Sequence, residues 1–181
     1  MNPNARTFET VQAFLIYKLI ISQKRRRRWR RDRMIHFVEI DETNWRLPLK
    51  VSKEQESYVA GSTAILARAY AYRNARSRAF FIYDGETPVG MGLYYDCEPL
   101  RAYDFSQLFI DEHFQGKGYG REAARLVLDY MKKDGKYDKV IQCYIQGNEA
   151  AKNLYESCGF VEIGRDEDEI ILELDLRTYR N

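Results

Sequence analysis

The chain has 181 residues, of which 45% are hydrophobic and 14% aromatic, and its formal net charge is +2. This length and apolar content suit one folded domain with a substantial core, together with an appendage. The three cysteines lack the spacing of metal ligands, and an odd number of cysteines does not fit a disulfide framework. The chain has only two histidines, which excludes a metal site with three His ligands. We therefore expect reduced thiols, a cytoplasmic location and no metal site.

The first 33 residues differ from the rest of the chain in charge. Residues 1–33 carry ten Lys and Arg against two acids, whereas residues 34–181 carry nineteen against twenty-five. The apolar stretch 11–22 contains Lys18 and is shorter than the roughly 20 residues that span a membrane, so no transmembrane segment is expected. The basic run after it could bind nucleic acid or an anionic membrane surface. Alternatively, this part is a non-native extension, because a clean strand pattern begins directly after it.

The folded part is predicted to begin with a strand and two helices. The apolar pattern of residues 35–40 predicts the strand. A short helix is predicted within 41–51, and Pro48 would end it. Residues 52–74 predict a long helix, because apolar residues recur at helical spacing, although Gly61 weakens its middle.

The middle of the chain predicts three consecutive strands and a helix. Residues 79–84 and 88–96 flank a Gly-Glu turn and predict a hairpin. A third strand is predicted over 102–111. The helix after it spans about 118–134, and its buried face is expected to hold Ala123, Ala124, Val127, Leu128 and Met131.

The remaining elements complete an alternating pattern. Residues 139–145 predict a strand, and Asn148 opens a helix that runs to about Ser157. Two further strands, within 160–166 and 169–176, form a second hairpin. The order β-α-α-β-β-β-α-β-α-β-β predicts an α/β domain with a mixed sheet.

A glycine cluster lies where the third strand leads into the following helix. Glycines without a Cβ let backbone amides converge on a phosphate at a helix N-terminus. No run matches the G-x-x-x-x-G-K-[ST] phosphate loop, and the dinucleotide fingerprint finds Arg121 or Ala123 where it needs its last glycine. The run reads Q-x-x-G-x-G instead, over Gln115, Gly116, Lys117, Gly118, Tyr119 and Gly120. Alone, it would also suit a tight turn whose glycines only provide positive φ.

A second motif lies in GNEAAKNLYESCGF, residues 147–160. Asn148, Ala151 and Tyr155 share one face of the predicted helix, since they are spaced i, i+3 and i+7. A lone tyrosine at this spacing would be interpreted as a core aromatic, but here both motifs occur in order and in the expected elements. Together they resemble the GNAT family of N-acetyltransferases, over about residues 35–175.

The resemblance implies a mixed, mostly antiparallel central sheet flanked by helices, with acetyl-coenzyme A (acetyl-CoA) as co-substrate. It also implies direct transfer of the acetyl group to a primary amine. Tyr155 would act as the general acid that protonates the CoA thiolate, and an amide of Leu108 or Phe109 would polarise the thioester carbonyl. The cofactor-binding residues that it implies are Leu108, Phe109, Ile110, Gln115, Gly116, Lys117, Gly118, Tyr119, Gly120 and Asn148.

The acceptor side of the resemblance is less specific. The runs VSKEQESYVAGS, GLYYD and YDFSQLFIDEHFQGKGYG look like the bacterial spermine/spermidine (diamine) acetyltransferase branch, so a polyamine is the expected acceptor. One departure is Ser106-Gln107, where the better-known diamine N1-acetyltransferases have two adjacent acids. Other acceptors therefore stay open, namely a protein N-terminus, a lysine, an amino acid or an aminoglycoside. A non-catalytic acetyl-CoA-binding protein is a further alternative.

A protonated amine must lose a proton before it can attack, so the reaction needs a base. The candidates, as base or as amine-binding groups, are Glu54, Glu56, Asp96, Glu98 and Asp104. Taken singly, each of them is interpreted by default as a solvated surface acid. Cys143 has no obvious His partner and is expected to be a structural thiol rather than a nucleophile. The last hairpin leaves a sheet edge that a homodimer could cover, and no nucleic acid is expected as a partner of the folded domain.

Overall fold

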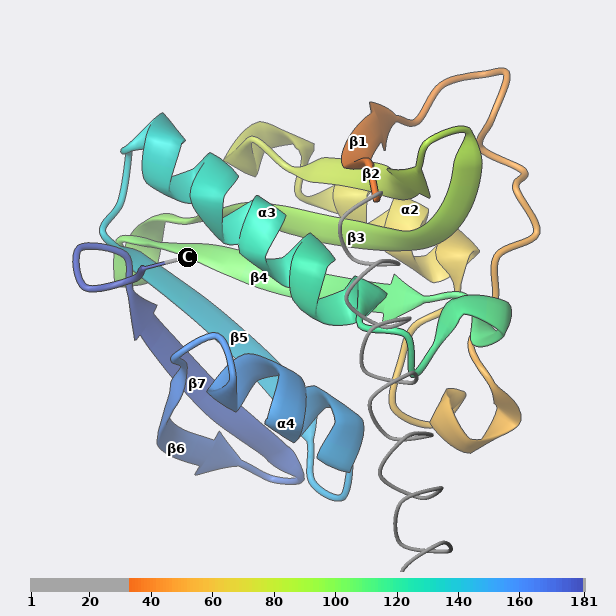
Figure 1. Ribbon diagram of the computed structural model, residues 1–181. Coiled ribbons are helices and arrows are strands. Elements are labelled where there is room, and N and C mark those ends of the chain that lie inside the picture. Colours follow the sequence, from red (N-terminus) through yellow and green to blue (C-terminus); the bar gives the residue numbers. More distant parts are fainter. Residues whose placement is uncertain (1–32, 181) are drawn as a thin grey trace, which may run out of the picture. The chain divides into compact units, whose positions relative to one another are not determined.

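Residues 33–180 are described by a computed structural model, and seven of their segments form one β-sheet (Figure 1). The strand order is β1-β2-β3-β4-β5-β7-β6, and all neighbours are antiparallel except β4 and β5. The strands are β1 (Ile35–Glu39), β2 (Arg78–Asp84), β3 (Thr87–Cys97), β4 (Ala102–Ile110), β5 (Lys139–Ile145), β6 (Val161–Asp166) and β7 (Glu169–Asp175). The sheet is therefore mixed and mostly antiparallel, as predicted.

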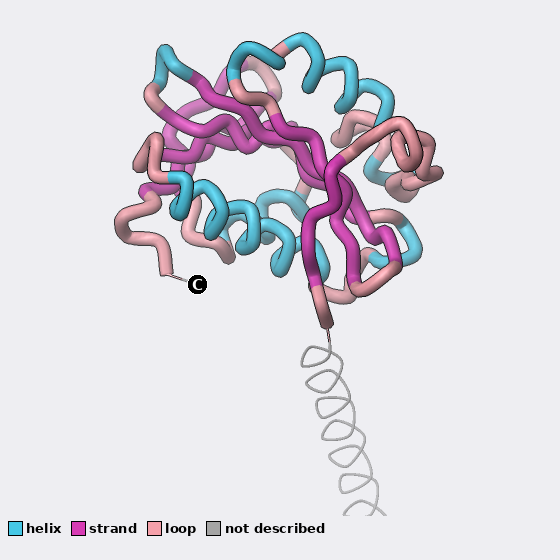
Figure 2. Tube along the Cα trace, turned by 90° about the horizontal axis from the view of Figure 1, so that it is seen from above, coloured by secondary structure: helices cyan, strands magenta, loops and turns pink. Residues whose placement is uncertain are grey.

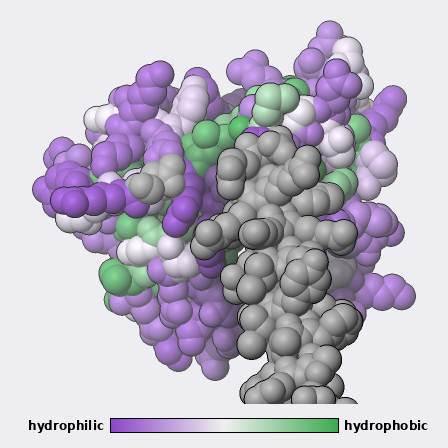
Figure 3. Space-filling model, in the orientation of Figure 1, coloured by the Kyte–Doolittle hydropathy of each residue, from purple (hydrophilic) through white to green (hydrophobic). Residues whose placement is uncertain are grey.

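Helices cover both faces of this sheet. In the described part of the chain they are α2 (Ser62–Ala71), α3 (Tyr119–Asp134) and α4 (Glu149–Glu156). Residues of α3 and α4 share one hydrophobic cluster with Tyr103 and Phe105, whereas α2 contributes Ile65 to a second cluster with Leu93 and Phe109. Figure 2 shows the sheet between α2 and α3, and we call its two sides the α2 face and the α3 face. Most of the coloured surface in Figure 3 is hydrophilic, as expected where apolar side chains fill these clusters.

Helix α3 matches its prediction closely. Gly118, with a φ of 91°, lies at its N-cap, and Gly135, with a φ of 68°, follows its last turn. Glycine reaches this left-handed region at little cost, so the sequence itself sets both ends of the helix. The residues that α3 buries include the whole predicted face, Ala123, Ala124, Val127, Leu128 and Met131.

The short helix predicted within 41–51 is wrong, because this segment makes only a turn. The Asp41 carboxylate accepts hydrogen bonds from the backbone N–H groups of Thr43 and Asn44, at 2.7 and 3.2 Å. Such local side-chain bonds compete with the helical ladder. Pro48 then provides no N–H with which a helix could continue.

The long helix predicted over 52–74 is interrupted, so one α-helix rather than two lies between β1 and β2. Gly61 is extended, with a φ of −68° and a ψ of 161°, and α2 begins only after it. Before Gly61 the chain makes a short 3₁₀ turn at Lys53–Gln55. Glycine loses more conformational entropy in a helix than other residues do. Gly61 is therefore unfavourable inside a helix, even though apolar residues recur at helical spacing on both sides of it. We call residues 53–60 the strap.

The predicted extension 1–33, with its apolar stretch and its basic run, lies outside the described residues except for Arg33. The domain boundary predicted there stays a prediction. Within residues 33–180, no helix is long and apolar enough to cross a lipid bilayer. Strands β1 and β6 form the two edges of the sheet, and β6 exposes the side chains of Val161 and Ile163.

Candidate active site

Strands β4 and β5 separate after a short parallel contact. Their ladder contains only two pairs, Tyr103 with Val140 and Asp104 with Ile141. Beyond these pairs β4 stays bonded to β3 and β5 to β7, so each strand presents a backbone edge that the other does not cover. Figure 1 shows the two strands diverging there. We call this interruption of the ladder the gap, and it lies between residues 105–110 and 142–145.

Backbone groups of β4 face the gap at alternate residues. The N–H of Asp111 donates to the C=O of Val89 at 2.9 Å, and Phe109 lies two residues earlier in the same register, opposite Met91. Hydrogen-bonding direction alternates along an antiparallel pair, so the polar groups of Phe109 point to β3 and those of Leu108 point to the gap. Of the two amides considered for polarising a thioester carbonyl, only that of Leu108 therefore has the suitable direction.

The glycine loop begins at Gln115, whose side chain closes the far end of β4. Its Nε2 donates to the C=O of Ile110 at 2.9 Å and to Oε1 of Gln55, in the strap, at 2.8 Å. Two residues later, Lys117 Nζ donates to the C=O of His113 at 2.7 Å. The loop is therefore fixed to β4, to the strap and to its own preceding turn.

The glycines of this loop give it an open backbone. Gly116 and Gly118 have φ angles of 69° and 91°, which side-chain-bearing residues rarely adopt. A Cβ at Gly116 would meet no atom within 4 Å, so the loop is accessible at this point. Tyr119 is only 4% exposed, and its hydroxyl donates to Oδ2 of Asp84 at 2.8 Å. Tyr119 can therefore serve a ligand in the loop only through its backbone.

Helix α4 carries the second motif on the α3 face. Asn148 caps it, because Oδ1 of this side chain accepts from the N–H of Ala151 at 3.1 Å. Tyr155 is 2% exposed, and its ring packs edge-on against Phe105 and Phe160, with centroids 6.0 and 5.4 Å away. Burial raises the pKa of the Tyr155 hydroxyl well above its usual range, so it keeps its proton at neutral pH. Since Phe105 directly follows the last ladder pair, Tyr155 lies at the closed end of the gap.

Asp104 lies at the same end of the gap but on the α2 face. It is paired with Tyr95, a member of the cluster on that face, and Arg68 of α2 donates to Oγ of the nearby Ser106 at 3.0 Å. Burial raises the pKa of the Asp104 carboxyl, and the Tyr95 hydroxyl and the Arg68 guanidinium offset only part of that rise. A carboxylate with a raised pKa holds a proton more strongly, which suits a general base.

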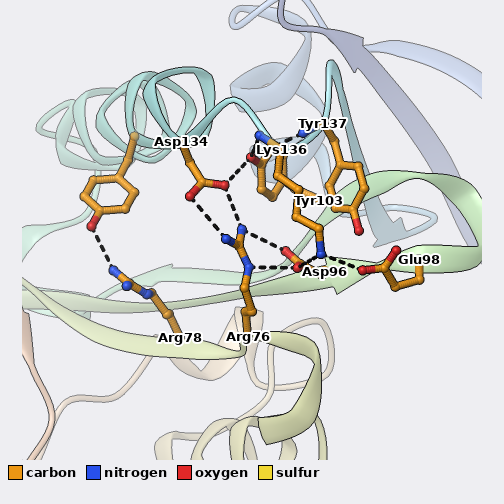
Figure 4. Close-up of polar contacts among 9 residues, drawn as sticks. Arg76, Arg78, Asp96, Glu98, Tyr103, Asp134, Lys136 and Tyr137 are labelled. Atoms are coloured by element: carbon orange, nitrogen blue, oxygen red, sulfur yellow. Dashed lines mark hydrogen bonds and ion pairs between the residues drawn. The ribbon is translucent and has the colours of Figure 1, made fainter.

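Asp96 and Glu98 lie in a different environment, an ion-pair network on the α3 face (Figure 4). The Asp96 carboxylate contacts Nε of Arg76 at 2.8 Å and Nζ of Lys136 at 2.6 Å, and Glu98 contacts the same Lys136. Arg76 also pairs with Asp134 of α3 at 2.7 Å. We call these five residues the ion-pair network. It joins the end of β3 to the C-terminal end of α3.

The acids predicted to bind an amine therefore do not converge on one site. Asp96 and Asp104 lie on adjacent strands, but they are paired with Tyr103 and Tyr95, whose side chains lie in the clusters of opposite faces. Successive side chains of a strand alternate between faces, and the sequence alone did not give the register. Glu54 is exposed and lies on the strap, outside the two strands that carry Asp96 and Asp104.

The strap contacts loops on both sides of the gap. Gln55 bonds the glycine loop that follows β4. Tyr58 reaches the turn between β5 and α4, because a Cβ at Gly147 would lie only 3.2 Å from the Tyr58 hydroxyl. The strap therefore spans the open end of the gap, and it carries two exposed carboxylates, Glu54 and Glu56.

Cys143 lies on β5, beyond the last ladder pair. Burial, together with the nearby carboxylates of Glu169 and Asp104, raises the pKa of the Cys143 thiol to about 11. A thiol that keeps its proton is a poor nucleophile at neutral pH. This supports the expectation that Cys143 is structural.

No role at the site was predicted from the sequence for Gln55, Tyr58, Arg68 or Tyr95, although two of the quoted runs, VSKEQESYVAGS and GLYYD, contain three of them. These residues lie near the gap because distant segments fold together, and Gln55 is 60 positions from its partner in the glycine loop. No spacing rule predicts such a contact. Gln142 does carry a signal in the sequence, because it is a polar residue within an otherwise largely apolar strand.

The sequence matches the family model described as Acetyltransferase (GNAT) family, over residues 29–160. This match confirms the resemblance identified from the two motifs. Among curated proteins, a spermine/spermidine N(1)-acetyltransferase of Bacillus subtilis (strain 168) is 27% identical over 120 residues, which are 63% of this chain and 78% of that protein. A probable spermine N(1)-acetyltransferase of Bacillus subtilis subsp. natto (strain BEST195) matches to the same extent.

Solved structures share the fold. The spermidine N-acetyltransferase of Vibrio cholerae, in complex with CoA and spermine, superposes with a TM-score of 0.64 at 22% identity, over 81% of this chain and 98% of that one. The ribosomal-protein-S18-alanine N-acetyltransferase of Escherichia coli gives 0.61 at 17% identity, over 79% and 94%. These likenesses confirm the predicted fold class, and the two proteins act on different amines.

Proposed function

From the premise that the chain belongs to the acetyltransferase (GNAT) family, whose model matches residues 29–160, we propose that it transfers acetyl from acetyl-CoA to a primary amine of a polyamine such as spermine or spermidine. The observation that carries the proposal is the gap, with a glycine loop at its open end and Tyr155 and Asp104 on opposite faces of its closed end.

The residues around the gap suit acetyl-CoA, which supplies the activated acetyl group when bound. The amides of Gly116 and Gly118, at the N-terminus of a sixteen-residue helix, suit the pyrophosphate. The gap-facing backbone of Leu108 suits an extended arm that carries amide groups and adds to β4 like a further strand. Asn148, near the turn after β5, is the proposed contact for that arm on the other side.

The placement of proton-transfer groups on two faces suits direct transfer. An alkylamine with a pKa of about 10.4 is protonated at neutral pH, so the Asp104 carboxylate takes one proton from it, directly or through water. The N–C bond forms as the C–S bond breaks, and the N–H of Leu108 donates to the carbonyl oxygen meanwhile. The Tyr155 hydroxyl gives its proton to the departing sulfur, and the second proton of the attacking nitrogen passes through water to the Tyr155 oxygen, which restores the hydroxyl. Asp96 and Glu98 have no part in this scheme, since cations of the ion-pair network already engage them.

The names of the two curated relatives support a polyamine as acceptor. The exposed acids of the strap, Glu54 and Glu56, could hold the distal ammonium groups of a long substrate.

A specific observation favours a second candidate, an amine that carries its own carboxylate, such as an amino acid or a peptide N-terminus. Arg68 bonds Ser106 on the face where the proposed base lies, and a guanidinium there would attract a carboxylate and repel a polycation.

The test is CoA release with acetyl-CoA and a panel of amines, followed by mass analysis of the products. The panel contains spermine, spermidine, a short diamine, a peptide with a free N-terminal alanine, a lysine peptide and an aminoglycoside. We expect kcat/KM to be highest for the two polyamines. A higher value for the alanine peptide would favour the second candidate, and CoA binding without turnover of any amine would indicate a non-catalytic binding protein.

Two further properties are proposed with the function. A cytoplasmic location fits three cysteines that are all free in this fold. Among the strands that the structure describes, β6 is paired on one side only, and it exposes Val161 and Ile163, so a second copy of the chain could pair there to form a homodimer. Analytical ultracentrifugation tests the dimer, and Val161→Lys should dissociate it.

A further inference from the structure

Gln142 is a buried polar residue next to the closed end of the gap. It follows Ile141, the last β5 residue that pairs with β4, and it is 4% exposed. Strand alternation places its side chain on the same face as Val140, which is fully buried in the cluster with α3 and α4. This is also the face on which Tyr155 packs.

The side-chain amide of Gln142 lies at the gap itself. The N–H of Gln146 donates to the C=O of Asp168 at 2.7 Å, and the same register pairs Gln142 with Leu172 two steps earlier. By alternation, the backbone groups of Gln142 point to β7 and the C=O of Cys143 points to the gap. Nε2 of Gln142 donates to that C=O at 2.8 Å. The amide therefore covers a carbonyl that no strand of the described part of the chain lies opposite.

This contact fixes the orientation of the amide and leaves its other atom unused. Because the Cys143 carbonyl can only accept, Nε2 must face it, and Oε1 points elsewhere. Oε1 is buried, and it has no hydrogen-bond partner among residues 33–180. An unsatisfied buried acceptor is rare in native proteins and calls for an explanation.

A second glutamine, Gln115, also covers a backbone carbonyl at the gap, but from the β4 side. Gln115 covers the C=O of Ile110 at the open end of β4, and its Nε2 also reaches Oε1 of Gln55. Both glutamines thus supply an N–H to a backbone carbonyl that faces the gap. Only Gln142 keeps a buried oxygen without a partner, and this oxygen needs an N–H or O–H donor.

We propose that Gln142 binds the pantetheine arm of CoA, with Oε1 accepting a hydrogen bond from one of its amide N–H groups. This inference rests on the proposed function, because it requires CoA in the gap. Pantetheine is a chain with two secondary amides, so it brings N–H donors of the kind that the missing strand would have provided. Gln142 is then a binding residue that acts beside Leu108, from the opposite strand.

The experiment measures the binding of two ligands by calorimetry, CoA and its adenosine bisphosphate half, which lacks the pantetheine arm. The proteins are the wild type and Gln142→Met, which keeps an unbranched side chain of similar length. The control variant is Ser77→Ala, which removes another buried oxygen without a partner, just before β2 and away from β4 and β5. Thermal unfolding of each ligand-free protein accompanies the titrations.

We expect Gln142→Met to weaken CoA binding about fivefold, the size of one neutral hydrogen bond, and to leave binding of the adenosine bisphosphate unchanged. Ser77→Ala should change neither. Equal affinity of Gln142→Met and wild type for CoA would overturn the proposal, as would an equal loss for both ligands. If Gln142→Met does not fold, Gln142→Leu replaces it under the same criteria. A wild type that binds neither ligand would instead overturn the proposed function.

Discussion

The ion-pair network and the gap belong to one sheet, but their carboxylates have opposite environments: those of the network contact cations, and that of Asp104 is mainly affected by burial. In the network, Asp96 contacts both Arg76 and Lys136, and Arg76 also pairs with Asp134. At the gap, burial is the largest influence on Asp104 and raises its pKa. Charges that are matched by fixed partners stabilise a fold, whereas buried groups that are left short of partners mark a place for a ligand. The difference separates the paired acids of the network from Asp104, the proposed base, although these acids look alike in the sequence.

The largest expected effect comes from Asp104→Asn. Loss of a general base should lower kcat/KM for the best amine by about 10²–10⁴-fold, and the variant should fold at least as stably as the wild type because a buried carboxylate is removed. Steady-state kinetics and thermal unfolding measure the two quantities. Asp96→Asn, assayed at a temperature where it is folded, is the matched control and should keep kcat/KM near the wild-type value. Equal losses in both variants would break the comparison.

Tyr155→Phe tests the proposed proton donor on the α3 face of the gap. Without the hydroxyl the departing thiolate is not protonated, so kcat should fall by about 10²-fold while the affinity for CoA stays unchanged. Single-turnover kinetics and calorimetry separate the two readouts. Tyr137→Phe, beside the ion-pair network, is the control and should retain full kcat. A Tyr155→Phe enzyme with wild-type kcat would remove this residue from the mechanism.

Asp96→Asn tests how much the ion-pair network stabilises the fold. It leaves the cations of Arg76 and Lys136 without their shared carboxylate, and we expect the free energy of unfolding to fall by about 2–3 kcal/mol. The value lies below that for a fully buried pair, because the Arg76 and Lys136 side chains are 48% and 34% exposed. Urea denaturation provides the measurement. Glu98→Gln should have little effect, since the Glu98 side chain is 67% exposed, and a larger loss there would contradict this ranking.

The pH dependence of stability should have opposite signs for the two regions. The hydrogen bond from Arg76, with help from the Tyr103 hydroxyl, lowers the pKa of Asp134 below 3.8, so its contribution is present above that pH and is lost as pH falls. Burial raises the pKa of Asp104 above 3.8, so its contribution is present below that pH and is lost as pH rises through the raised value.

Unfolding free energies measured across this pH range should therefore change differently in two variants. Asp134→Asn should flatten the loss of stability on the acid side, and Asp104→Asn should flatten the loss at higher pH. The kcat/KM profile of the wild type should rise with pH through the Asp104 pKa, and this rise should be absent from any residual activity of Asp104→Asn. Identical profiles for the two variants would contradict the contrast between the regions.

Local chemistry determined most of the fold from the sequence alone. Apolar alternation predicted the strands, and the apolar periodicity after the glycine cluster predicted α3 almost to the residue. The two motifs, at 115–120 and around Tyr155, led to the family because they sit in the expected elements. The two wrong helix predictions also have local causes. The Asp41 carboxylate accepts backbone hydrogen bonds that compete with a helix within 41–51, and the extended Gly61 interrupts the helix predicted over 52–74.

Only the tertiary structure decided which acids could work together and which backbone groups face the gap. The register of β3 against β4 puts Asp96 and Asp104 on opposite faces, and the strand order leaves Leu108 and the Cys143 carbonyl without a strand across from them. Spacing along a chain fixes which side chains share a face of one element. It carries no information about which element lies opposite, because that choice depends on pairing between segments far apart in sequence.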